Sequence, residues 1–150
     1  PYTGTAAFTL LYLHTYSKTV YRFVMESQHG VGGGGTKIAA PINKLENFSG
    51  GLEGVDLILM GHHHKLASAV QNRMYISSGK NPHITHRSVK LVVTGSFLKG
   101  YLEGSSRQGR AQGDYAEQAM YSPLALGGPE IEIRRVRRNG NYVAEAFIEV

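Results

Sequence analysis

Residues 55–64 read VDLILMGHHH, an almost continuous apolar run that ends in one glycine and three histidines. A short apolar run is typical of a strand buried on both faces of a sheet. Ligand sites in such sheets gather in the loops beyond the carboxyl ends of the strands. Alternate residues of an extended segment point the same way, so we expect His62 and His64 to address one site and His63 to face elsewhere. Neutral imidazole is the commonest metal ligand, and the segment therefore predicts a metal-binding strand end.

Length and composition limit the alternatives. At 150 residues the chain is long enough for one domain with a hydrophobic core. It begins with Pro1, and we expect it to be a piece of a longer protein. Without cysteine, any metal must be held by histidine, carboxylate or amide groups. This composition is compatible with the cytoplasm, and no apolar run approaches the length of a transmembrane helix. The net charge of +5 favours an anionic partner, phosphate groups or nucleic acid, or simply keeps the protein soluble.

Hydrophobic patterns and turn residues predict the elements around this segment. Apolar and β-prone runs indicate strands at residues 8–13, 20–27, 55–60, 73–77, 89–94, 131–136 and 142–150. A helix is expected to begin at Pro41, where proline is tolerated, and to end at Gly50-Gly51. Asn139-Gly140 predicts a hairpin turn, and Gly104–Gly113 a mobile loop tip. The order predicts a strand-rich α/β (α+β) domain with a mixed sheet.

A second histidine also follows a predicted strand. His29 comes directly after the run Val20–Ser27, and a glycine-rich stretch, Gly30–Gly35, follows it. The stretch lacks the spacing of a P-loop. It could bring main-chain amides or Lys37 near a phosphate ester, or it could be a flexible connection to the helix.

The two histidine segments resemble motifs of the calcineurin-like metallophosphoesterase superfamily. Gly61-His62-His63-His64 looks like its closing G-H-x-H motif, and Ser27-Gln28-His29-Gly30 resembles the histidine motif before it. The stretches 29–46, 94–98 and 115–123 are similar to a bacteriophage-type branch. The resemblance implies the C-terminal half of an αββα-type mixed β-sandwich.

The resemblance also implies a cofactor and roles for individual residues. Two divalent metal ions (Mn, Fe, Zn or Ni) would be bound, one by His29 and His62 and the other by His64. A hydroxide between the ions would attack a phosphomonoester or phosphodiester, with nucleic acid as one candidate substrate. Gly30, Lys37 and His63 are candidates for contacts with the substrate or with the metal ligands.

Several residues that the family requires are missing. We find no D-x-H, no G-D-x-x-D and no G-N-H-E or G-N-H-D sequence, so no catalytic residue is assigned to this chain. The acid nearest a motif is Asp56, which we expect to make a strand-start or helix-capping contact. Residues 1–150 are thus predicted to form one partial domain. An absent N-terminal half, or another chain, would complete the site, unless catalysis has been lost.

Two further functions stay open. The chain could be a non-catalytic metal- or nucleic-acid-binding domain that uses the basic stretch Arg134–Arg138. The alternative is that the stretch is a solvated sheet edge without a binding role. In either case alternation places Arg135 and Arg137 on one face and Arg134 on the other. The hypothesis that the chain is a structural component of a virion is supported only by the phage-like resemblance. We expect a cytoplasmic protein, in the host cytoplasm if it is phage-encoded, with no membrane partner.

Overall fold

A computed structural model gives the positions of most of the chain. It describes residues 5–16, 19–30, 37–78, 80–97, 106–107, 110–111, 126–138 and 140–150. The glycine run Gly32–Gly35, most of the loop Gly104–Gly113, the stretch Tyr115–Pro123 and Asn139 lie outside the described residues.

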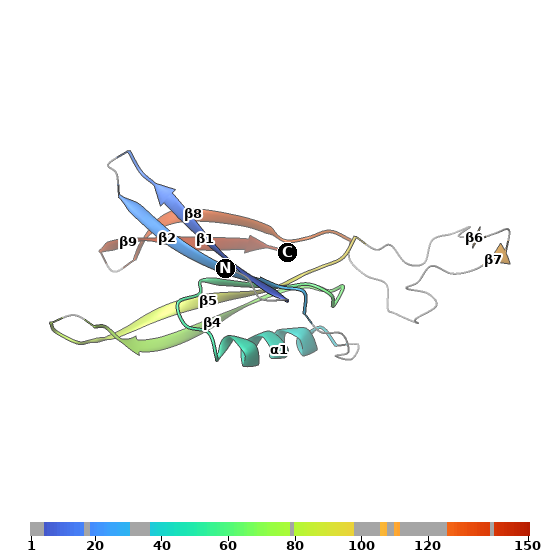
Figure 1. Cartoon of the computed structure of the whole chain (residues 1–150), viewed down its shortest axis with the longest axis horizontal. Helices are drawn as coiled ribbons and strands as arrows, with labels where there is room; N and C mark the ends of the chain where they lie inside the picture. The colour runs from blue at the N-terminus through green and yellow to red at the C-terminus, as the bar shows by residue number, and fades with distance from the viewer. Residues whose placement is uncertain are drawn as a thin grey trace.

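A five-stranded mixed sheet forms the centre of the fold (Figure 1). Its strands are β1 (Ala6–His14), β2 (Val20–Gln28), β3 (Leu57–Met60), β4 (Leu66–Ile76) and β5 (Ile84–Thr94). They are arranged in the order β1-β2-β3-β5-β4. The central strand β3 runs parallel to both neighbours, β2 and β5. The outer pairs, β1 with β2 and β4 with β5, are antiparallel. The carboxyl ends of β2, β3 and β5 therefore meet at one edge of the sheet.

One helix and one long hairpin cover the two faces of this sheet. The helix is α1 (Ala39–Ser49), and the hairpin consists of β8 (Glu130–Arg138) and β9 (Asn141–Glu149). Two short strands, β6 (Ser106–Arg107) and β7 (Arg110–Ala111), pair with each other. The prediction of a strand-rich, mixed α/β domain is confirmed. Among the described residues, no helix is both long and apolar enough to cross a membrane.

Several predicted boundaries were wrong; β5, for example, begins at Ile84 rather than at Val89, and β3 at Leu57 rather than at Val55. The helix begins at Ala39 rather than at Pro41. Proline is accepted at this third helical position because the first-turn N–H groups have no acceptor within the helix. The predicted strand 73–77 is only the end of β4, which begins at Leu66. Small and polar residues fill its first half, so the apolar run there is weak, but pairing with β5 keeps it extended along its full length.

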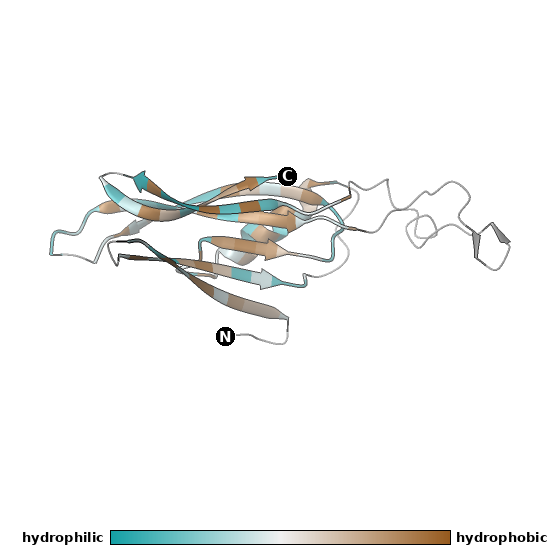
Figure 2. Cartoon of the chain, turned by 90° about the horizontal axis from the view of Figure 1, so that it is seen from above, coloured by the Kyte–Doolittle hydropathy of each residue, from teal (hydrophilic) through white to brown (hydrophobic). Residues whose placement is uncertain are grey.

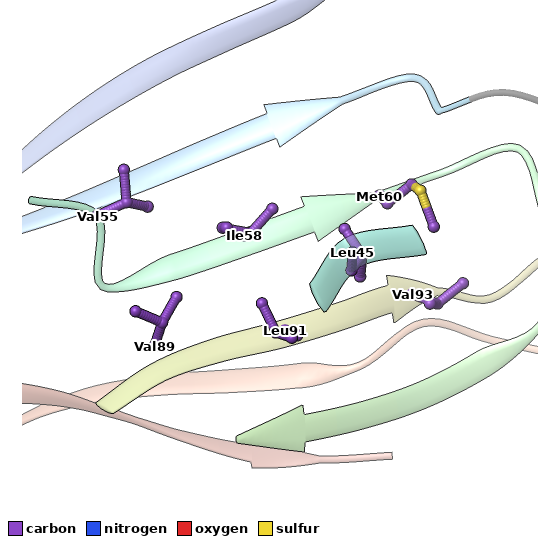
Figure 3. Close-up of a cluster of buried hydrophobic side chains, with 7 residues drawn as sticks. All are labelled: Leu45, Val55, Ile58, Met60, Val89, Leu91 and Val93. Atoms are coloured by element: carbon purple, nitrogen blue, oxygen red, sulfur yellow. The ribbon is translucent and has the colours of Figure 1, made fainter. Parts of the chain in front are cut away.

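Two hydrophobic layers hold the elements together. Leu45 of α1 packs with Ile58, Met60, Leu91 and Val93 of the central strands on one face of the sheet (Figure 3). On the other face, a second cluster joins the sheet to the hairpin. Its fully or almost fully buried members are Phe23, Leu57, Val92 and Ala146. Apolar and polar residues alternate along the hairpin strands (Figure 2), as expected when only one face is buried.

A single arginine secures the carboxyl end of the helix. The Arg73 guanidinium on β4 donates hydrogen bonds to the carbonyl oxygens of Ser49 and Leu52. The last carbonyls of a helix have no partner within it and carry partial negative charge. A cation at this position therefore satisfies them and fixes α1 against the sheet.

Candidate metal centre

The predicted histidine segments lie at the carboxyl ends of adjacent parallel strands. His29 follows β2, and His62 follows β3 after Gly61. Strand pairing sets their registration, because Met60 lies opposite Gln28 and the Gly61 N–H donates to the Gln28 carbonyl at 3.1 Å. The parallel ladder between β2 and β3 therefore brings the two histidine segments together.

The imidazole rings themselves come close together. The ring centroids of His29 and His62 are 4.8 Å apart, and those of His62 and His64 are 6.4 Å apart. Two imidazoles that bind one ion at about 2.0–2.1 Å place their ring centroids roughly 4.5–5 Å apart. Two aromatic rings that pack edge to face without a metal have centroid distances in the same range. Measuring the metal content of the protein therefore distinguishes a metal-bound pair from a packed pair.

The backbone at the histidine segment adopts an unfavourable conformation. His62 and His64 both have positive φ angles, 67° and 52°. The His63 N–H donates to the Gly61 carbonyl at 2.9 Å, which closes a three-residue turn around His62. Positive φ is uncommon for a residue with a side chain, and such strain concentrates at functional sites. The segment is therefore not the extended continuation of β3 that the alternation argument assumed, and the turn, rather than strand alternation, sets the directions of its side chains.

A hydroxyl next to the end of β5 orients one of the histidines. The Nδ1 atom of His64 lies 3.2 Å from the Oγ of Ser96, which is almost fully buried. Metal-binding histidines usually make such a bond with the ring nitrogen that does not bind the ion. With Nδ1 in this bond, Nε2 is the nitrogen that would bind a metal ion.

The three further candidates occupy different environments. Gly30 has a φ of 85°, and a Cβ atom there would lie 2.7 Å from Met60 Cγ and 2.8 Å from the Gly61 carbonyl oxygen. Lys37 is exposed, and its carbonyl accepts a 2.9 Å hydrogen bond from Lys65 Nζ, which ties the start of α1 to the histidine segment.

His63 differs from its two neighbours. Its Nε2 atom is buried and has no hydrogen-bond partner among the residues that the structure describes. Burial, followed by the positive charge of Lys44, lowers the pKa of His63 below its usual value of 6.5. The ring is therefore neutral at pH 7.

The histidines fit part of a metal centre and no more. Within the described ranges, no three His, Cys, Asp or Glu side chains lie close enough together to hold one ion. His29 and His62 supply two nitrogen ligands at most, whereas a structural or catalytic zinc site has at least three protein ligands. Further ligands would have to come from residues outside this described set.

The two acids of the central strands have different roles. Asp56 bonds with residues that are distant in the sequence: its Oδ2 accepts from the Val24 N–H at 2.8 Å, and its Oδ1 pairs with Arg87 at 2.6 Å. Glu26 was missed. It is fully buried on β2, and neither carboxylate oxygen has a partner among the described residues. Burial raises its pKa to about 7. The only sequence signal was one acid within an apolar strand.

The basic stretch on the hairpin lies along β8, and its charges are partly paired. Arg134 binds Glu132, and Arg138 binds Glu145 at 2.7 Å. The guanidinium of Arg134 lies over Phe147, whereas that of Arg135 lies over Tyr142, on the opposite face of the hairpin. The predicted division between the two faces is confirmed. Arg134 and Arg138 are less suited to a phosphate contact than Arg135 and Arg137, because each already pairs with a carboxylate.

Comparison with known proteins adds no assignment. No protein-family model, no curated protein and no solved structure matches this chain significantly.

Proposed function

We propose that this chain contributes the histidine side of a binuclear-metal phosphoesterase centre, and that its fold is the C-terminal half of an αββα sandwich. The layers support the fold proposal: α1, the five-stranded sheet and the β8–β9 hairpin would supply one helical layer and both sheet layers. The activity proposal depends on one observation. The His29 and His62 rings approach to 4.8 Å at the ends of adjacent parallel strands.

The chemistry assigned to these residues is binding and positioning. His29 and His62 would hold one divalent ion, and His64, oriented by Ser96, would hold a second. Two such ions, when bound, supply an activated water and neutralise the charge of the phosphoryl oxygens. The lowered pKa of His63 keeps its ring neutral at pH 7, so it adds no charge that would repel a cation.

Metal content tests the proposal directly. The purified chain is loaded with Mn²⁺ or Zn²⁺, desalted, and measured by elemental analysis, alongside His62→Ala, His29→Ala and the control His14→Ala. His14 ends β1, far along the chain from the site, and is exposed. Because two histidines alone hold an ion weakly, we expect less than one ion per chain in the wild type and in the control. Each of the other variants should retain at least tenfold less metal. Equal metal content in all four proteins would refute the proposal.

Activity also requires carboxylate ligands, which the described residues do not provide at this site. In a protein that carries them, hydrolysis of a generic aryl phosphodiester with added Mn²⁺ should fall at least 100-fold in His62→Ala and His64→Ala. Full activity in both variants would exclude a role for these histidines in the reaction, even if the metal were bound.

A further inference from the structure

A groove lies at the opposite end of the sheet from the histidines. It has a volume of about 700 Å³. The sheet opens there because β3 begins only at Leu57, so the starts of β2 and β5 have no strand between them. Figure 1 shows the β1–β2 and β4–β5 ribbons diverging away from the helix. Residues 142–146 of β9 complete the groove, which thus has three walls.

Positive charge exceeds negative charge in this groove. Its lining includes the cations Arg22, Arg87, Lys90 and Arg138 and only two acids, Asp56 and Glu145. Asp56 pairs with Arg87 at 2.6 Å, and Glu145 pairs with Arg138 at 2.7 Å and with Lys90 at 3.9 Å. Within the described part of the chain, no carboxylate pairs with Arg22. The groove as a whole therefore favours an anionic ligand.

Each wall of the groove also contributes a tyrosine. Tyr21 comes from β2, Tyr75 from β4 and Tyr142 from β9. Tyr75 and Tyr142 are about half exposed, at 50% and 47%. The guanidinium of Arg135 lies 4.5 Å from the centre of the Tyr142 ring and restrains its orientation. Exposed aromatic rings next to cations are the combination with which proteins hold single-stranded nucleic acids: bases stack on the rings and phosphates contact the cations.

We infer that this groove binds a nucleotide unit, with its base against Tyr142 or Tyr75 and its phosphate near Arg22. The volume is within the range of small-molecule sites, about 300–1,000 Å³. An acidic peptide would satisfy the charge but would give the tyrosines no planar group to stack on. The nucleotide unit is either free or part of a single strand, since both present the same base and phosphate.

The groove is independent of the proposed metal centre. Arg22 and the end of β2 are separated by six residues of extended chain, about 20 Å. Binding can therefore be measured in EDTA, where the histidine site holds no ion. A failure of one proposal leaves the other intact.

Fluorescence anisotropy tests the inference. A fluorescein-labelled 12-nucleotide dT strand is titrated with the chain in 50 mM salt and EDTA, and unlabelled dTMP and poly-glutamate are used as competitors. We expect Tyr142→Ala to weaken binding at least fivefold. Arg22→Ala should weaken binding and lower the slope of log K against log salt by about 0.7. Tyr75→Ala gives a second aromatic variant if Tyr142→Ala does not fold.

The control variant is Arg134→Ala, which removes the same charge from an exposed position of β8 that does not line the groove. The inference is supported if Arg134→Ala still binds the strand and the groove variants do not. Competition by dTMP would identify a free nucleotide as a ligand, and no competition by dTMP would identify the strand as the ligand. No binding by the wild type would overturn it. So would an equal loss in Arg134→Ala, or competition by poly-glutamate as strong as by the unlabelled strand.

Discussion

Glu26 makes the stability of this protein depend on pH in an unusual direction. The side chain is fully buried on β2 with both carboxylate oxygens unpaired among the described residues, and burial raises its pKa from 4.5 to about 7. The folded protein then binds this proton more tightly than the unfolded chain does. The stability that the proton confers is fully present below pH 4.5 and is lost progressively as the pH rises to about 7.

The size of the effect follows from the same pKa values. Each pKa unit corresponds to about 1.36 kcal/mol, so a rise from 4.5 to about 7 costs the folded state about 3 kcal/mol at pH 8. Glu26→Gln keeps the shape of the side chain and removes its titration. We expect the variant and the wild type to have similar unfolding free energies near pH 4.5, and the variant to be more stable by about 3 kcal/mol at pH 8.

Urea unfolding at several pH values between 4.5 and 8 measures this difference. Subtracting the wild-type free energy of unfolding from that of Glu26→Gln cancels the titration of the other groups, provided that both transitions are two-state. Glu26→Met serves as a second variant, because it replaces both unpaired oxygens with apolar atoms. Its free energy of unfolding should lack the Glu26 titration between pH 4.5 and 8. A difference between Glu26→Gln and the wild type that stays constant within 0.5 kcal/mol from pH 4.5 to 8 would refute a titrating, buried carboxyl group.

Four other substitutions test local features by the same unfolding measurement. Gly30→Ala should destabilise the fold by more than about 2 kcal/mol, because the new methyl group meets the main chain of the histidine segment as well as adopting a φ of 85°. Gly140→Ala, with a φ of 83° but open space around its Cβ, should cost only about 1 kcal/mol; equal losses at both glycines would mean that the close approach at Gly30 is wrong. Asp56→Ala should cost about 1–3 kcal/mol, because it leaves the main-chain N–H of β2 and the guanidinium of Arg87 without their acceptor; a loss below 0.5 kcal/mol would contradict this role. His62→Gly should raise the unfolding free energy by roughly 1 kcal/mol by relieving the positive φ while lowering metal affinity; a less stable variant would show that the ring contributes more than the strain costs.

The sequence by itself determined most of the secondary structure and the position of the histidine site. The apolar run before Gly61 specifies a buried strand because such residues are stable only when both faces are covered. The turn signal at Gly140 placed the hairpin, and the pattern around Leu45 placed the helix to within two residues. The partners of Asp56, Val24 and Arg87, are more than 30 residues away in the sequence, so only the tertiary structure identifies them.

Only the tertiary structure decided which of these parts meet. Parallel pairing of β2 with β3 brings His29 to His62, and the tight turn at His62 replaces the extended geometry that alternation assumes. The sequence signals the isolation of the Glu26 carboxyl group only through an acid within an apolar strand, and it gives no local signal for the groove between the diverging ribbons. Both depend on contacts between residues far apart in the chain, and these are set by sheet order and by the short length of β3, rather than by the identity of any one residue.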